Sequence, residues 1–335
     1  MLDLTKYPTL HASRAFSKNT VDALRQAFEN HRTVLAPLAA IGAAGSLGRL
    51  EAGPDSDLDA ICLLDASHAS THQLEAAMEC VWEIATGAGL RVPKHDGIFR
   101  DAVVAEQLLN LDSLGKLDES PSIFGKRIQI LLDTRALSGH DYLVDTRRRV
   151  LDWYAWPFRN LYSEGLWEYL LSDLIRYANA YRNWQAVKLN RTADDSWALR
   201  HAKLRSTRLV TWLGLWGLIL RAMELRQDGF EWMLEHLELT PLERIALLID
   251  DESPVAMVNV LTSYESIMVN LQNPDVRARL IRSGPPYSEG QQPFHCEEFR
   301  QILQHSDALR EALTQFFAAR FARASSASQR MALPF

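Results

Sequence analysis

Two aspartates with the spacing Asp-x-Asp, Asp57 and Asp59, stand at the start of an apolar segment that ends at Leu64. Side chains two residues apart on a β-strand point to the same face, so these carboxylates are expected side by side. Carboxylates this close repel each other unless a cation neutralises them, and oxygen ligands of this kind suit Mg²⁺ or Mn²⁺. The pair therefore predicts a metal site, where bound ions can align an attacking oxygen with a leaving pyrophosphate.

A glycine–serine pair, Gly45 and Ser46, lies upstream, after a small apolar segment. Glycine lets the backbone approach a phosphate closely, and the serine hydroxyl and backbone N–H groups that open a helix can hold phosphate oxygens. Together with the aspartates, this predicts attack on the α-phosphate of a nucleoside triphosphate. A bare Asp-x-Asp is more often a solvated acidic turn, but the glycine–serine pair and the apolar strand favour an active site. Asp55 precedes the strand and is interpreted as a turn residue.

The elements that must position these residues alternate between helix and strand over the first hundred residues. Apolar spacing predicts helices at 19–31 and 71–86, and short apolar runs predict strands at 38–45, 57–64 and 90–92. After about residue 120 the strand signals disappear. Apolar residues at helical spacing then predict helices at 123–137, 141–156, 166–184, 198–225, 241–248, 255–271 and 296–322.

We therefore expect an α+β chain with two domains and a tail. A small mixed β-sheet domain with the catalytic groups covers 1–118, an all-helical substrate- and nucleotide-binding domain covers 119–323, and a flexible tail covers 324–335. The longest apolar run, 209–220, is too short for a bilayer and predicts a buried helix. The N-terminus lacks the pattern of a signal peptide, so we expect a cytoplasmic protein without a membrane partner.

The string from Gly45 to Asp59 resembles the signature of the DNA polymerase β-type nucleotidyltransferase superfamily, in which Gly-Ser precedes Asp-x-Asp at this spacing. It is most similar to the branch that contains the N-terminal domain of bacterial PII uridylyltransferases and a large group of related, little-characterised proteins. Weaker similarity at 128–139, 169–177 and 197–208 resembles helical segments of that branch. Only the Gly-Ser and Asp-x-Asp signature is highly specific.

The resemblance implies a role for each residue of the signature. Gly45 and Ser46 would bind the triphosphate, with Arg49 and Ser56 of the same string among the nucleotide-binding residues, and Asp57 and Asp59 would bind the metal. Members typically carry a third carboxylate that activates the attacking hydroxyl. In this chain the first choice for that catalytic residue is Asp96, with Asp101 and Glu106 as rivals.

The segment from Asp145 to Arg208 is basic, with a net charge of +5, although the whole chain carries −6. Arg200 and Lys203 within it share a helical face and are predicted to bind nucleotide. The alternative is a solvated helix with paired charges. Tryptophans interleaved with these arginines, Trp184 among them, are more often core residues, but they can also stack bases.

The overall charge of −6 argues against broad binding to nucleic acid or anionic lipid. Three scattered cysteines exclude a disulfide framework and are interpreted as buried small residues.

Three functions remain open from the sequence. The first is a metal-dependent nucleotidyltransferase whose acceptor is a nucleotide, a nucleic-acid end or a protein, including oligonucleotide synthesis in bacterial signalling or defence and a nucleotidylating enzyme of toxin–antitoxin type. The second is a catalytically degenerate regulatory module that binds nucleotide. The third is a nucleic-acid-binding protein. A homo-oligomer is compatible with each of them.

Overall fold

The computed structural model describes most of the chain and divides into two compact units. The described residues are 2–65, 70–93, 98–110, 116, 118–155, 167–191, 196–225, 228–249, 254–282 and 296–323. The first unit, here the sheet unit, comprises Ala12–Asp173 and Leu225–Thr240. The second, here the helical unit, comprises Met1–His11, Leu174–Glu224 and Pro241–Phe335. The expected boundary after residue 118 does not coincide with a boundary between these units, and the expected tail at 324–335 lies outside the described residues.

The sheet unit contains a four-stranded mixed sheet with the strand order β3-β2-β1-β4. The strands are β1 (Leu38–Ala44), β2 (Asp59–Leu64), β3 (Val103–Val104) and β4 (Arg135–Ser138). Strand β1 is antiparallel to both β2 and β4, whereas β2 is parallel to β3. The α+β class with a small mixed sheet is therefore confirmed.

Two expectations about the sheet are wrong. The third strand is not 90–92, because Arg91 forms only an isolated bridge with Asp57. The predicted helix at 123–137 is α4 (Pro121–Leu132) followed by strand β4. A short buried apolar run fits helix and strand equally well, and what selects the strand is pairing with β1, a contact that periodicity does not show.

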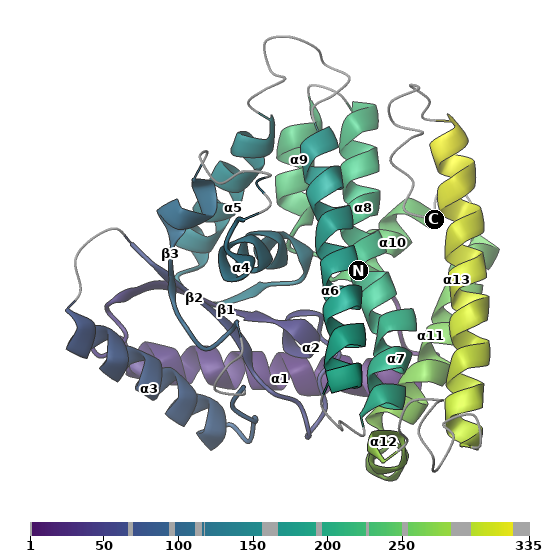
Figure 1. Ribbon diagram of the computed structural model, residues 1–335, viewed down its shortest axis with the longest axis horizontal. Helices are drawn as coiled ribbons and strands as arrows, with labels where there is room; N and C mark the ends of the chain where they lie inside the picture. Colours follow the sequence, from purple (N-terminus) through teal and green to yellow (C-terminus); the bar gives the residue numbers. More distant parts are fainter. Residues whose placement is uncertain are drawn as a thin grey trace. The chain divides into compact units, whose positions relative to one another are not determined.

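Helices cover both faces of the sheet (Figure 1). Helices α1 (Pro8–Asn30) and α3 (Thr71–Gly87) pack on one face, where Leu24 and Phe28 of α1 and Val81 of α3 join Ala60 and Cys62 of β2 in one buried cluster. On the other side lie α4 and α5 (His140–Ala155). Side chains alternate along β2, so the face that carries Asp59 is the one turned away from α1 and α3.

The start of α1 differs from the expectation. The helix begins at Pro8, whereas the sequence predicted a start at residue 19. The Thr20 hydroxyl instead donates to the main-chain oxygen of Phe16, the bond that a threonine inside a helix makes with the preceding turn.

The predicted helices after residue 139 are present, with changes at their ends and two additions. The predicted helix at 198–225 is two helices, α7 (Trp197–Arg205) and α8 (Thr207–Leu225), because Ser206 leaves helical geometry with φ −130° and ψ −91°. The short helices α9 (Gly229–His236) and α12 (Pro274–Ile281) were not predicted. The others are α6 (Glu168–Arg191), α10 (Pro241–Ile249), α11 (Pro254–Gln272) and α13 (Glu297–Arg323).

The apolar run at 209–220 lies in α8, whose residues from Val210 to Leu220 are buried, as expected. Close packing explains the two glycines in this run, since a Cβ at Gly214 would lie 2.8 Å from the Cα of Pro241 and a Cβ at Gly217 would collide with the Leu248 side chain. Throughout the described ranges, every helix is too short or too polar to span a bilayer.

Cys62 and Cys80 are buried, as expected, whereas Cys296 is only partly buried, and this gives a prediction. Burial raises the pKa of the Cys62 thiol to about 12 and also raises the pKa of Cys80. At pH 8, Cys62 is then a neutral thiol, and the thiolate is the nucleophile. We expect a thiol reagent to leave Cys62 unmodified in the native protein and to label all three cysteines in denaturant. Rapid native labelling of Cys62, located by peptide mass spectrometry, would contradict the buried position.

Candidate active site

The turn from β1 into α2 (Gly45–Gly48) brings the glycine–serine pair against the strand that carries the aspartates. Gly45 has φ +66°, a conformation that favours glycine, and a Cβ on it would collide with Oδ2 of Asp59. Ala44, immediately before it, pairs with Asp59 in the β1–β2 register. The predicted phosphate-binding turn and a predicted metal ligand are therefore in direct contact.

The short helix α2 ends in a backbone arrangement that fixes the residues after Ser46. The N–H of Glu51 donates to the oxygen of Ser46 at 2.8 Å, and the N–H of Leu50 donates to the oxygen of Leu47 at 3.1 Å. This is the Schellman pattern, with Leu50 at the left-handed position that glycine usually occupies. Its φ of +59° is costly for a side chain with a Cβ, so the surrounding contacts must hold this turn in place.

A buried ion network supplies those contacts. The Arg49 guanidinium donates to Glu51 at 2.8 Å and to Asp133 at 2.7 Å, and all three side chains are almost completely buried. Asp133 also accepts from the amide of Gln129. Since Asp133 follows α4, the network joins the end of α2 to the α4–β4 turn. Gly48 fits this close approach, because a Cβ there would collide with the Asp133 carbonyl oxygen.

This geometry differs from the expectation for Arg49. The sequence placed Arg49 among the nucleotide-binding residues, but its guanidinium points into the protein and binds two carboxylates. Arg49 therefore positions the turn that carries Ser46, and it contacts a nucleotide only if the buried network opens.

Ser46 and Ser56 come together as expected. Their hydroxyl oxygens lie 3.4 Å apart, and the Ser56 hydroxyl accepts from the N–H of Gly53 at 3.0 Å. Both side chains are partly exposed. Two hydroxyls therefore stand beside the Gly45 turn, where a phosphate group can reach them.

Main-chain hydrogen bonds on both sides hold Asp57. The Leu58 N–H donates to the Arg91 oxygen at 3.0 Å, and the Arg91 N–H donates to the Ser56 oxygen at 3.1 Å. Asp57 is exposed and Asp59 partly buried, and alternation places both on one face. Asp55, the neighbouring acid, forms an ion pair with Arg91 instead, in agreement with its interpretation as a turn residue.

The donor set at this site fits a magnesium ion. Mg²⁺ takes oxygen ligands and is commonly held by one or two carboxylates together with waters and substrate phosphates. Asp57 and Asp59 supply two carboxylates, and the serine hydroxyls lie at the adjacent turn. Within the described ranges, no group of three or more histidine, cysteine, aspartate or glutamate side chains is arranged as a metal site.

The candidates for a third carboxylate differ in position. Asp96 lies outside the described residues. Asp101 precedes β3, which runs parallel to β2. Because Val103 pairs with Leu63, Asp101 lies level with the middle of β2, about two residues beyond Asp59. Glu106 follows β3, in the 3₁₀ helix η1 (Ala105–Leu109), and forms an ion pair with Arg149. Of the described rivals, Asp101 has the better position.

Asp101 is also held by a buried lysine. Lys126 Nζ donates to the main-chain oxygen of Asp101 at 2.8 Å, and the lysine side chain is almost completely buried. Burial lowers the pKa of Lys126, and the negative charge of Asp101 opposes that shift.

Ion pairs neutralise part of the basic segment. Arg200 and Lys203 lie on α7 in the helical unit, where Arg200 donates to Gln185 at 3.2 Å. Gly45, Ser46, Ser56, Asp57 and Asp59, in contrast, all belong to the sheet unit. Four other arginines form ion pairs between different elements: Arg147 with Glu238, Arg148 with Glu231, Arg149 with Glu106 and Arg205 with Asp307. For these four, the alternative of paired charges fits better than a cationic wall.

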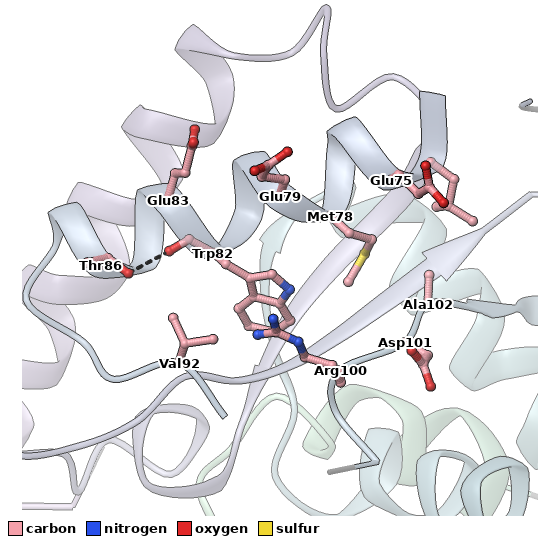
Figure 2. Close-up of a pocket in the computed structure, with 11 residues that line it drawn as sticks. Glu75, Met78, Glu79, Trp82, Glu83, Thr86, Val92, Arg100, Asp101 and Ala102 are labelled. Atoms are coloured by element: carbon pink, nitrogen blue, oxygen red, sulfur yellow. Dashed lines mark hydrogen bonds between the residues drawn. The ribbon is translucent and has the colours of Figure 1, made fainter. Parts of the chain in front are cut away.

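A pocket of about 990 Å³ lies beside the sheet, between α3 and residues 100–102 (Figure 2). The Arg100 guanidinium lies over the Trp82 ring, 5.3 Å from its centroid, and Met78 and Val92 line the same space. The glutamates of α3 at the rim, Glu79 and Glu83, point away from the indole in this view. The Arg100 guanidinium therefore already occupies the face of the Trp82 ring that lines this pocket.

Comparison with protein-family models, with curated proteins and with solved structures gives no match.

Gly45 offers a direct test of the turn geometry. We expect Gly45→Ala to lower the free energy of unfolding by about 1–3 kcal/mol, the usual cost of a side chain in a left-handed conformation, and to displace the Asp59 carboxylate. Gly87→Ala is the matched control, because an added Cβ there meets nothing within 4 Å. Denaturant unfolding measures both variants. Equal stability of the two would contradict the close contact between Gly45 and Asp59.

Sequence reasoning missed two features of this site. Glu51 stands inside the string that carried the resemblance, but its spacing alone does not show that it pairs with Arg49. Asp133 was assigned to a helix, so its contact with Arg49, 84 residues away in sequence, had no local signal.

Proposed function

We propose that this protein is a metal-dependent nucleotidyltransferase. It transfers a nucleoside monophosphate from a ribo- or deoxyribonucleoside triphosphate to an acceptor hydroxyl and releases pyrophosphate. The observation that carries the proposal is the direct contact between the Gly45 turn and Asp59, which joins a predicted phosphate-binding segment to a predicted metal ligand.

The residues of the site suggest a division of roles. The Ser46 hydroxyl and the backbone N–H groups of its turn would hold phosphate oxygens of the triphosphate. Asp57 and Asp59 would hold Mg²⁺ or Mn²⁺. When bound, the ion neutralises phosphate charge and aligns the attacking and leaving oxygens. The buried Arg49 network holds the end of α2 against the α4–β4 turn, so the turn that carries Ser46 is positioned before the substrate arrives.

The reaction forms one bond and breaks one. The acceptor oxygen attacks the α-phosphorus, and the bond from that phosphorus to the bridging oxygen of the β-phosphate breaks. The proton of the acceptor hydroxyl goes to a carboxylate, for which Asp96 and Asp101 are the candidates. A nucleotide, a nucleic-acid end and a protein side chain each offer a suitable hydroxyl.

Replacement of the carboxylate that acts as general base gives a further prediction. General-base catalysis contributes about 10²–10⁴-fold, so we expect Asp96→Asn or Asp101→Asn to lower kcat by that factor with little change in KM. Glu106→Gln is the control, because Glu106 follows β3 and is paired with Arg149. Steady-state kinetics of the three variants assign the base. Full activity in both aspartate variants, or an equal loss in Glu106→Gln, would contradict the assignment of the base to Asp96 or Asp101.

The proposed function is tested by incubating the protein with a mixture of all nucleoside triphosphates and Mg²⁺ or Mn²⁺. We expect pyrophosphate, together with a product whose mass exceeds that of an acceptor by one nucleoside monophosphate. Mass spectrometry of the mixture identifies the base and the acceptor together. Binding of triphosphate, seen as a thermal shift, without turnover on nucleotide, nucleic-acid or protein acceptors would instead favour the degenerate regulatory module.

A further inference from the structure

Three aromatic side chains form a ladder on successive turns of α6. Tyr177 and Tyr181 are stacked with ring centroids 6.4 Å apart and an interplanar angle of 22°, and the Trp184 ring lies 6.3 Å from that of Tyr181. The spacing of four and three residues puts all three rings on one face of the helix. We call Tyr177, Tyr181 and Trp184 the aromatic ladder.

The ladder is at the surface, although aromatic residues at helical spacing usually belong to a core. Trp184 is 54% exposed, and both tyrosines are partly exposed. Tyr181 is supported from below by the buried Trp212 of α8, whose ring meets it edge-on at 6.3 Å. This contact places α6 beside α8 (Figure 1). The ladder is therefore an aromatic surface that is partly open to solvent and is supported by the buried Trp212.

Cationic side chains accompany the ladder. The Arg208 guanidinium lies over the Tyr181 ring, 5.1 Å from its centroid, and that of Arg182 lies over Trp212 at 5.0 Å. Arg208 comes from α8 and Arg182 from α6, so two helices contribute. Between Leu174 and Arg191 the sequence has four cationic residues and no acidic one. The aromatic ladder is thus accompanied by two arginines, Arg182 and Arg208, in a chain with an overall charge of −6.

This combination fits one class of ligand. Bases have flat π-faces that stack on exposed aromatic rings, and phosphates between the bases require cations at regular intervals. A duplex hides its base faces and offers only its phosphates to such a surface. A proline-rich peptide can dock on aromatic rings and an acidic peptide can pair with arginines, but a single strand of nucleic acid uses both features together.

We propose that the aromatic ladder with Arg182 and Arg208 binds single-stranded nucleic acid, with bases stacked on Tyr177 and Trp184 and phosphates held by the arginines. The proposal depends on the surface of α6 and α8 alone and requires no catalytic activity at the Asp57–Asp59 site.

The test is fluorescence anisotropy with end-labelled single strands of deoxythymidine and of uridine, each of about 12 nucleotides, within the known range of single-strand site sizes. We expect the wild-type protein to bind at least one strand more tightly than a duplex of equal length. We also expect affinity to fall as salt rises, because phosphate contacts release counterions. The two strands distinguish DNA from RNA.

Variants separate stacking from charge. Trp184→Ala and Tyr177→Ala should each weaken binding about tenfold, whereas Trp184→Phe, which keeps a ring, should retain most of the affinity. Arg208→Gln should reduce the slope of log affinity against log salt by about 0.7, the value for one phosphate contact with a single strand. Trp232→Ala is the matched control, since Trp232 is also a partly exposed tryptophan but lies on α9 against His236.

The proposal is wrong if neither strand binds at low salt, or if a duplex binds as tightly as a single strand. It is also wrong if Trp184→Ala and Trp232→Ala weaken binding equally, or if a mononucleotide binds as tightly as the strand and displaces it. The last outcome would show a subsite for one base only. Because Trp184 is exposed, its variants are expected to keep the wild-type circular dichroism spectrum, so a loss of binding is not a loss of folding.

Discussion

Replacing both Asp57 and Asp59 by asparagine is expected to lower the rate of pyrophosphate release at least about a hundredfold. Loss of a single supporting partner of a metal ligand already costs about 10–100-fold, and this change removes both carboxylates of the proposed metal site. Pyrophosphate release with Mg²⁺ and with Mn²⁺ measures the effect. The fold should persist, because Asp57 is exposed and Asp59 only partly buried.

Asp55→Asn is the matched control for this prediction. Asp55 carries the same charge two residues before Asp57, but it faces Arg91 in an exposed ion pair, which contributes little to stability. We expect nearly unchanged turnover in Asp55→Asn. Equal losses in Asp55→Asn and in the double variant would mean that general charge, and not the Asp57–Asp59 pair, matters. Unchanged turnover in the double variant would place the reaction elsewhere.

The second large effect is expected from Arg49→Ala. Removing the guanidinium leaves Glu51 and Asp133 as buried carboxylates without their partner. Breaking a buried ion pair from one side costs about 3–5 kcal/mol, and we expect that loss in the free energy of unfolding. Arg49→Lys should recover only part of it, since an ammonium does not reproduce the two directed contacts of the guanidinium.

Arg148→Ala is the control for Arg49, because Arg148 pairs with Glu231 at the surface. Exposed pairs contribute at most about 1 kcal/mol, so its unfolding curve should shift little. Denaturant unfolding compares the two variants. If Arg49→Ala unfolds like the wild type but loses triphosphate affinity, Arg49 is a nucleotide contact, as the sequence suggested, and the positioning role is wrong.

The sequence predicted the elements whose signals are local. The small-residue strand β1, the apolar strand β2 and the helix α3 were located within two residues of their observed ends. The Gly-Ser and Asp-x-Asp pairs were also expected to serve one site, and Gly45 and Asp59 of these pairs lie in contact. These inferences succeed because a two-strand antiparallel unit depends on residues close in sequence.

Elements that depend on distant partners were not predictable in this way. The residues of β4 have the same apolar spacing as the end of a helix. They form a strand because they pair with β1. Strand β3 has only two residues, Val103 and Val104, too few for a periodic signal. The orientation of Arg49 depends on Asp133, whose position depends in turn on β4. A side chain inside a recognisable motif was therefore assigned to the substrate although it faces the protein interior.

The central claim is cleavage between the α- and β-phosphates at the Asp57–Asp59 site. It is tested most directly with one nucleoside triphosphate labelled at the α-phosphate and, separately, at the γ-phosphate. We predict that the α label enters the acceptor product and the γ label enters pyrophosphate in equal amounts, and that both signals are lost in the Asp57→Asn, Asp59→Asn double variant. Release of the γ label as orthophosphate, with the α label in a nucleoside diphosphate, would contradict the account.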